Sequence, residues 1–179
     1  FERISPAEIE AVRARYGLNG REALFMGLLG YPPNDEALRF LFGFFENVVR
    51  ANPGVRLAVL GGTVRRAASW LVNPGMIPHT DVPAVIRSSA VGLAPVFSGS
   101  GTRIKILEYA AAGIPVVATA KGAEGLPLKD RVHLRLADGG DAFVEAINDV
   151  YADRNAAAAM AARRPAQTPR LFSWPRLVA

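Results

Sequence analysis

Residues 90–118 read AVGLAPVFSGSGTRIKILEYAAAGIPVVA, and this stretch decides the fold. It begins with an apolar run that suits a buried strand and continues through a loop rich in glycine and serine into a helical pattern. It ends in a second apolar strand, 114–118. A strand, a helix and a further strand in succession form the repeating unit of a parallel sheet covered by helices. Ligands of such sheets bind at the carboxyl ends of the strands.

The same alternation extends in both directions from this unit. Apolar runs without polar alternation predict buried strands at 23–29, 55–60, 90–95, 114–118 and 132–137. Capping signals and helical spacing predict helices at 6–17, 35–52, 83–88, 102–113, 141–152 and 154–164. We therefore expect residues 1–179 to form a single Rossmann-like α/β domain with a doubly wound parallel sheet.

Composition narrows the classes of function. The chain has no Cys and only two His among its 179 residues, which excludes a disulfide framework and disfavours a metal site. The absence of Cys fits a reducing compartment, and no apolar stretch reaches membrane-spanning length. The net charge is +5, but the basic residues are scattered along the chain, so we expect no nucleic-acid partner. The first residues do not read as a targeting segment, and we expect the chain to be a piece of a longer protein.

Two of the predicted helices begin at the ends of strands, where a helix dipole could hold an anion. The earlier helix carries Asp35 and Glu36 in its expected first turn, where they complement the dipole and would repel a phosphate. The later helix carries Arg103 and Lys105 there, and positive charge at that end is unfavourable unless an anion offsets it. The later helix is therefore the predicted phosphate site.

The loop before this helix can bring its main chain close to a ligand, because two of its residues are glycines. It consists of Ser98, Gly99, Ser100, Gly101 and Thr102. Helical geometry places Lys105 and Glu108 on one stripe, where Glu108 can accept hydrogen bonds from two ribose hydroxyls of a nucleotide. The alternative is structural: the loop is only a connection, and Lys105 and Glu108 form a surface pair.

The segment from Gly99 to Thr119 resembles the donor-site signature of group 1 glycosyltransferases, which are retaining enzymes of the GT-B fold. The resemblance extends in order from the strand near Phe25 to Trp174 and implies that the chain is the C-terminal half of a GT-B architecture. An N-terminal acceptor domain is then absent from this chain. In the family, the glutamate that matches Glu108 contacts the ribose, and the loop that matches 99–102 approaches the diphosphate.

The resemblance implies an enzyme that transfers a sugar from a nucleotide diphosphate sugar to an acceptor with retention, in polysaccharide biosynthesis. Positive charge from Arg103 and Lys105 would stabilise the leaving nucleotide, with no cofactor and no metal required. The isolated domain should bind donor but transfer nothing. We expect the full-length enzyme in the cytoplasm, with the inner face of the membrane as an alternative place of association.

The sequence also departs from the family pattern. Ser100 stands where the usual signature has an acidic residue, and the turn from Gly30 to Asn34 lacks the Arg and Lys that many members use to hold the diphosphate. Arg103 and Lys105 are expected to replace them, with Gly30 at the mouth of the site. The segment His79-Thr80-Asp81 resembles the region of the family that contacts the base; alternatively, Thr80 or Asp81 is simply the cap of the helix that follows.

Three further alternatives stay open at this stage. The segment 122–125 either lines the same cleft or is a simple glycine turn. The whole chain could be a non-catalytic nucleotide-binding or interaction domain on the same fold. A dinucleotide-dependent oxidoreductase is disfavoured, because no G-x-G-x-x-G follows the first strand.

Overall fold

The computed structural model describes residues 4–99 and 104–163. Its strands are β1 (Glu22–Met26), β2 (Arg56–Leu60), β3 (Leu71–Gly75), β4 (Val91–Ala94), β5 (Val116–Ala118) and β6 (Arg135–Leu136). Its helices are α1 (Pro6–Tyr16), α2 (Pro32–Ala51), α3 (Val82–Ser88), α4 (Ile104–Ala112), α5 (Ala120–Ala123), α6 (Gly140–Ala152) and α7 (Arg154–Ala162). The predicted site residues Ser100, Gly101, Thr102 and Arg103, and also Trp174, lie outside the described residues.

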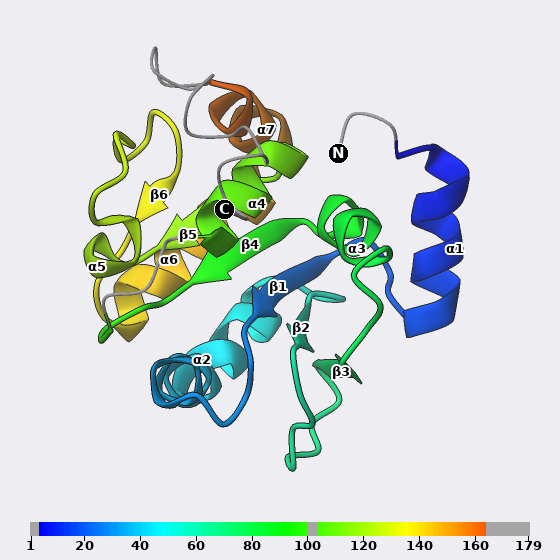
Figure 1. Cartoon of the computed structure of the whole chain (residues 1–179). Helices are drawn as coiled ribbons and strands as arrows, with labels where there is room; N and C mark the ends of the chain where they lie inside the picture. The colour runs from blue at the N-terminus through cyan, green and yellow to red at the C-terminus, as the bar shows by residue number, and fades with distance from the viewer. Residues whose placement is uncertain (1–3, 100–103, 164–179) are drawn as a thin grey trace.

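The six strands form one parallel sheet in the order β3-β2-β1-β4-β5-β6 (Figure 1). The chain moves outward from β1 to β3, returns to the centre at β4, and then moves outward in the other direction. The direction therefore reverses between β1 and β4. This confirms the predicted doubly wound α/β fold and creates a topological switch point, where sheets of this kind bind ligands.

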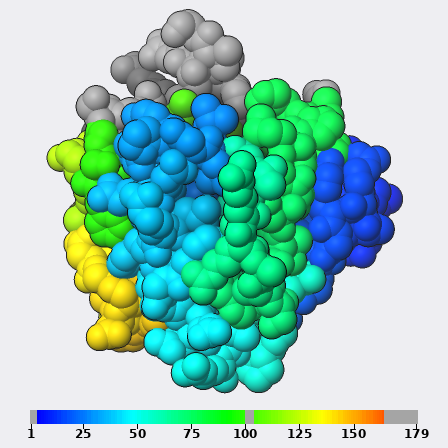
Figure 2. Space-filling model, turned by 90° about the horizontal axis from the view of Figure 1, so that it is seen from below, coloured from blue at the N-terminus to red at the C-terminus, as the bar shows by residue number. Residues whose placement is uncertain are grey.

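The side chains of β1 divide the core into two layers. Ala23 and Phe25 pack with α2 and α6 on one face, whereas Leu24 and Met26 pack with α1, α3 and α4 on the other. All five residues of β1 are buried, as expected for a central parallel strand. In Figure 2, α2 (blue to cyan) runs along the visible face beside α6 (yellow), and the two helices cover this side of the sheet.

Tyr109 fixes α4 to the centre of the sheet. Its buried hydroxyl donates to the carbonyl of Leu24 at 3.1 Å and accepts from the amide of Met26 at 3.2 Å. The ring packs closely against β4 at Gly92, where a Cβ would lie 2.3 Å from it. This anchor determines which face of α4 is turned toward β1, and that face includes Lys105 and Glu108.

The first strand and the helix that follows it begin and end earlier than predicted. β1 ends at Met26, and Leu28, expected in the strand, is 64% exposed in the following loop. The helix begins at Pro32 rather than after Asn34, because proline is well suited to the first helical position. Glu36 therefore lies beyond the first turn, which contradicts its predicted role as a dipole partner.

The outer strands of the sheet differ from the prediction as well. β3 was not predicted, because its residues Asn73, Pro74 and Gly75 are poor strand formers. The last strand has only two residues, Arg135–Leu136, instead of the six expected over 132–137. Arg131 before it has a φ of 56°, a turn conformation that interrupts the extended chain.

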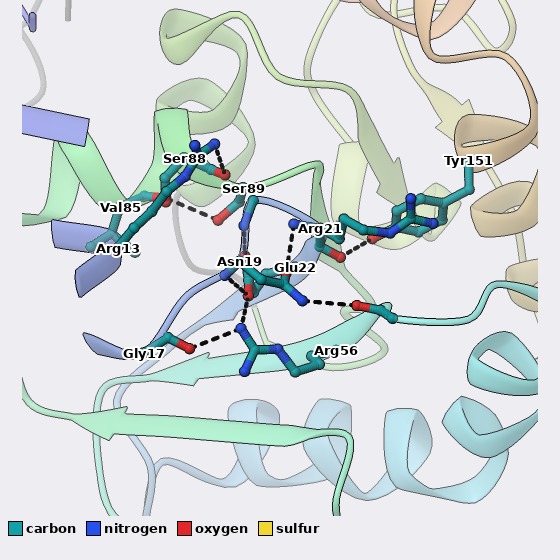
Figure 3. A network of polar contacts seen from close by, with 12 residues as sticks. Arg13, Gly17, Asn19, Arg21, Glu22, Arg56, Val85, Ser88, Ser89 and Tyr151 are labelled. Atoms are coloured by element: carbon teal, nitrogen blue, oxygen red, sulfur yellow. Dashed lines mark hydrogen bonds and ion pairs between the residues drawn. The ribbon is translucent and has the colours of Figure 1, made fainter. Parts of the chain in front are cut away.

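The amino ends of the strands meet in a network of polar contacts, shown in Figure 3. Glu22, at the start of β1, is 0% exposed. Its carboxylate accepts from the amides of Asn19 and Gly20 at 2.7 and 2.9 Å, and from the guanidinium of Arg56 at 2.6 Å. Arg56 also donates to the carbonyl of Gly17. This buried charge is therefore fully paired with protein donors.

Candidate functional site

The loops that follow β1 and β4 lie side by side at the switch point. Phe97, after β4, contacts the ring of Phe40 on α2, with the ring centroids 4.7 Å apart. The hydroxyl of Ser98 donates to the Glu36 carboxylate at 2.7 Å. Two contacts between residues more than 50 positions apart thus brace the predicted phosphate loop against α2.

Lys105, the second residue of α4, points toward the carboxyl end of β1. Its Nζ donates to Oδ1 of Asn34 at 3.2 Å and lies 4.7 Å from the centroid of the Phe25 ring. Burial lowers the pKa of Lys105 to about 8, against the opposing effect of the Glu108 charge. Among the described residues, the ammonium has no carboxylate in ion-pair contact, so the predicted surface pair with Glu108 does not form.

Glu108 lies one turn further along α4 and is half-buried. Burial raises the pKa of its carboxyl group, while electrostatic interactions with His79 and Lys105 act to lower it. These interactions place His79, on the loop between β3 and α3, within electrostatic reach of Glu108. The structure therefore brings together Lys105, Glu108 and His79, three residues from the predicted site.

The alternative explanation for the segment around His79 is a helix cap, and the structure confirms the position of the cap but not a capping hydrogen bond from Asp81. Asp81 occupies the position before α3 but makes no side-chain capping bond there. Its carboxylate instead accepts hydrogen bonds from Tyr16 and Arg15 at 2.5 and 2.7 Å, which ties α3 to α1. His79 itself is exposed. The cap thus does not account for a histidine at this position.

Gly99 and Gly30, the two glycines of the predicted site that the structure describes, both have a left-handed backbone conformation. Gly99 has a φ of 88°, and a Cβ there would lie 3.3 Å from the ring of Pro33, so the loop touches the start of α2 closely. Gly30 has a φ of 92°, and its amide donates to the Asp35 carboxylate at 2.9 Å. The Gly30 amide therefore points toward the start of α2.

Asn34 is the residue that the sequence did not reveal. It lies at the start of α2, and its side chain joins two segments: Nδ2 donates to the carbonyl of Leu28 at 3.0 Å, and Oδ1 accepts from Lys105. The only sequence signal was its place in the turn after the first strand. Its contact with Lys105 joins positions 71 apart and could not be read from local patterns.

The segment after β5 begins with a short helix, α5, which includes Gly122 and Ala123, and Glu124 and Gly125 follow it as a turn. The predicted glycine turn is therefore confirmed only for the second half of 122–125. Thr119 caps α5 by accepting from the amide of Gly122 at 3.0 Å and also accepts from the amide of Val96 at 3.1 Å. A Cβ at Gly122 would lie 2.6 Å from the carbonyl of Ala94. Gly122 therefore joins the ends of β4 and β5, which keeps this edge of the sheet compact.

Two further features of the described residues bear on the site. Within residues 4–99 and 104–163, no group of three or more His, Asp or Glu side chains is placed to share a metal ion. A cavity of about 310 Å³ lies elsewhere, between α6, α7 and the segment before β6. It is lined by Arg131, Arg135, Asp149 and Met160, and Arg135 already pairs with Asp149 across it.

A sequence profile described as Glycosyl transferases group 1 matches residues 20–153, well over half of the chain. The chain belongs to the group 1 glycosyl transferases. No curated protein matches this group 1 glycosyl transferase chain by sequence. Among the helices that the structure describes, none has the length and apolar character to cross a membrane.

Solved structures support the assignment at the level of the fold. The chain is similar to HepE of Anabaena, crystallised with UDP and glucose, with a TM-score of 0.73 at 17% identity. That match covers 89% of this chain and 46% of HepE. WaaG, a glycosyltransferase involved in lipopolysaccharide biosynthesis, matches with a TM-score of 0.72 at 20% identity, over 99% of this chain and 51% of WaaG.

A third match is to a single domain. The C-terminal domain of LpcC, a glycosyl transferase group 1 protein of Francisella tularensis, has a TM-score of 0.64 at 14% identity. The match covers 79% of this chain and 80% of that domain. The group 1 chain thus spans about half the length of HepE and WaaG, and its fold is that of GT-B C-terminal domains.

Proposed function

We propose that this chain is the donor-binding domain of a retaining glycosyltransferase and binds a nucleotide diphosphate sugar at the switch point between β1 and β4. The observation that carries the proposal is the Lys105 ammonium, half-buried at the carboxyl end of β1 with a neutral hydrogen-bond partner. Within the part of the chain that the structure describes, this half-buried cation has no carboxylate in ion-pair contact. Such an arrangement is unfavourable, and a diphosphate would supply the negative charge.

The orientation of the donor follows from the positions of Glu108 and His79. Glu108 lies on the same stripe of α4 as Lys105, where its carboxylate can accept hydrogen bonds from the ribose hydroxyls. His79, which interacts electrostatically with Glu108, is proposed to contact the base. The sugar then extends over the loop that follows β4. Complexes of HepE with UDP and with UDP-glucose support a uridine nucleotide as the first donor to test.

During transfer, the bond between the sugar and the diphosphate breaks and negative charge develops on the leaving nucleotide. The Lys105 ammonium stabilises this charge in a poorly hydrated site, and Arg103 is proposed to assist it. No metal is required in this scheme. The acceptor binds on an N-terminal domain, and the full-length enzyme works in the cytoplasm or at the inner membrane surface. This chain by itself binds donor without transferring sugar.

Isothermal titration of the folded chain with UDP and UDP-glucose tests the proposal. Lys105→Ala should weaken UDP binding by about tenfold or more, because it removes a charge-assisted hydrogen bond. Glu108→Gln should weaken it by roughly threefold to tenfold. The exposed residues Lys129 and Glu145 provide matched controls as Lys129→Ala and Glu145→Gln. A folded wild-type chain that binds neither ligand would refute the proposal.

A further inference from the structure

Asn34 is held rigidly between the first strand and α4. Its Nδ2 donates to the carbonyl of Leu28 at 3.0 Å, which leaves Oδ1 directed at Lys105 Nζ, 3.2 Å away. The side chain also packs directly against Gly27, where a Cβ would lie only 2.6 Å from Asn34 Cγ. The glycine thus provides the space that Asn34 occupies.

The local structure of α2 does not require this side chain. Asn34 is the third residue of the helix, and the residue before the helix, Tyr31, makes no side-chain capping bond. The main-chain amide of Asn34 already donates to the carbonyl of Tyr31 at 2.9 Å. The Nδ2 end of the Asn34 side chain thus holds the turn before α2, and its Oδ1 is available to another element, which is α4.

The side-chain amide of Asn34 is a suitable partner for a Lys105 ammonium that binds a phosphate. An amide oxygen fixes the direction of an ammonium by a hydrogen bond but leaves its positive charge uncompensated. A carboxylate at the same place would form an ion pair with Lys105 and compete with any incoming phosphate. Asn at position 34 thus differs in function from Asp, although the two side chains have the same shape.

We propose that Asn34 is a positioning residue, which holds the Lys105 ammonium at the carboxyl end of β1 so that it meets the diphosphate of the donor. The inference rests on the proposed function of the site. It assigns to the β1–α2 turn an indirect part in diphosphate binding: the turn carries no Arg or Lys of its own and acts by orienting a Lys from α4.

A double-mutant cycle with UDP as the probe tests this assignment. Asn34→Ala should weaken UDP binding by about threefold to tenfold in the wild-type background, and by less than about twofold in a Lys105→Met background. Asn34→Asp should weaken it more than Asn34→Ala, by about tenfold or more, because the new carboxylate neutralises Lys105. Asn47 on the exposed face of the same helix provides the controls Asn47→Ala and Asn47→Asp.

The outcomes separate this inference from the proposed function. If the wild-type chain binds no UDP, the proposed function fails and the role of Asn34 fails with it. If the wild type binds UDP but Asn34→Ala has no effect, or has the same effect in both backgrounds, only the role of Asn34 is overturned. Thermal melts of every variant monitor folding, and Asn34→Asp preserves the volume of the side chain should Asn34→Ala fold poorly.

Discussion

The two ends of β1 hold buried charges of opposite kind. At the amino end, Glu22 is fully buried and receives hydrogen bonds from two amides and from Arg56 (Figure 3). At the carboxyl end, Lys105 lies over Phe25 and is bonded to a neutral amide oxygen. The first arrangement is complete within the protein, while the second has no carboxylate in ion-pair contact among residues 4–99 and 104–163. We infer that the first end serves stability and the second serves a ligand.

The largest expected effect is at the amino end. Glu22→Gln should destabilise the chain by about 3 kcal/mol, because it leaves Arg56 partly buried without its carboxylate. Urea denaturation monitored by circular dichroism measures the change, and UDP affinity of the folded variant should stay within about twofold of wild type. A variant as stable as wild type would contradict the structural role of this end.

Lys105→Met should have the opposite effect on stability. Methionine fills the volume of the lysine stem without a charge to desolvate, so the ligand-free chain should become more stable by roughly 1–3 kcal/mol. The same variant should lose UDP affinity. Denaturation with and without saturating UDP separates the two effects. A ligand-free variant less stable than wild type would show that Lys105 is structural, as Glu22 is.

The pH dependence follows from the direction of the Lys105 shift. Burial lowers the pKa of Lys105 from 10.5 to about 8, so the charged group costs stability below pH 8, and this cost disappears as the pH rises from 8 toward 10.5. The stability advantage of Lys105→Met should therefore shrink over this range.

UDP affinity should change in the opposite direction over the same range. Affinity should fall as the pH rises through about 8, the pKa of Lys105 in the free chain, because the deprotonated lysine no longer attracts the diphosphate. Isothermal titration at several pH values measures this fall, which should be absent in Lys105→Met. A wild-type affinity that does not vary up to pH 10 would contradict a charged role for Lys105.

The smallest expected effect concerns Ser98. Its hydroxyl bonds the exposed Glu36 carboxylate, and an exposed hydrogen bond of this kind contributes about 0.5 kcal/mol or less. Ser98→Ala should therefore leave stability nearly unchanged and lower UDP affinity by about twofold to threefold. Glu36→Gln is the matched control. A loss of affinity larger than that of Lys105→Met would move the centre of the site from α4 to the loop.

Sequence patterns predicted the central part of the fold better than its margins. The strands around β1, β2, β4 and β5 are continuous apolar runs, and burial on both faces leaves few other solutions. β3 contains Asn, Pro and Gly and is formed by its pairing with β2, which no local pattern expresses. The prediction made the last strand too long, because the apolar pattern that ends in β6 begins in the turn before it.

The same limit applies to the site. Lys105 and Glu108 were predicted because they lie on one helix, whose periodicity fixes their relative direction. Asn34 was missed because its importance depends on a contact between α2 and α4, and the Gly27 that makes room for it looks like any glycine at the end of a strand. Residues that act through tertiary contacts can be recognised only once the three-dimensional structure is known.

The most direct test of the central claim is a crystal structure of this chain with UDP. We predict that the diphosphate lies within hydrogen-bond distance of Lys105 Nζ and that the ribose hydroxyls contact the Glu108 carboxylate. UDP bound elsewhere, for example in the arginine-lined cavity between α6 and α7, with Lys105 still bonded only to Asn34, would contradict it.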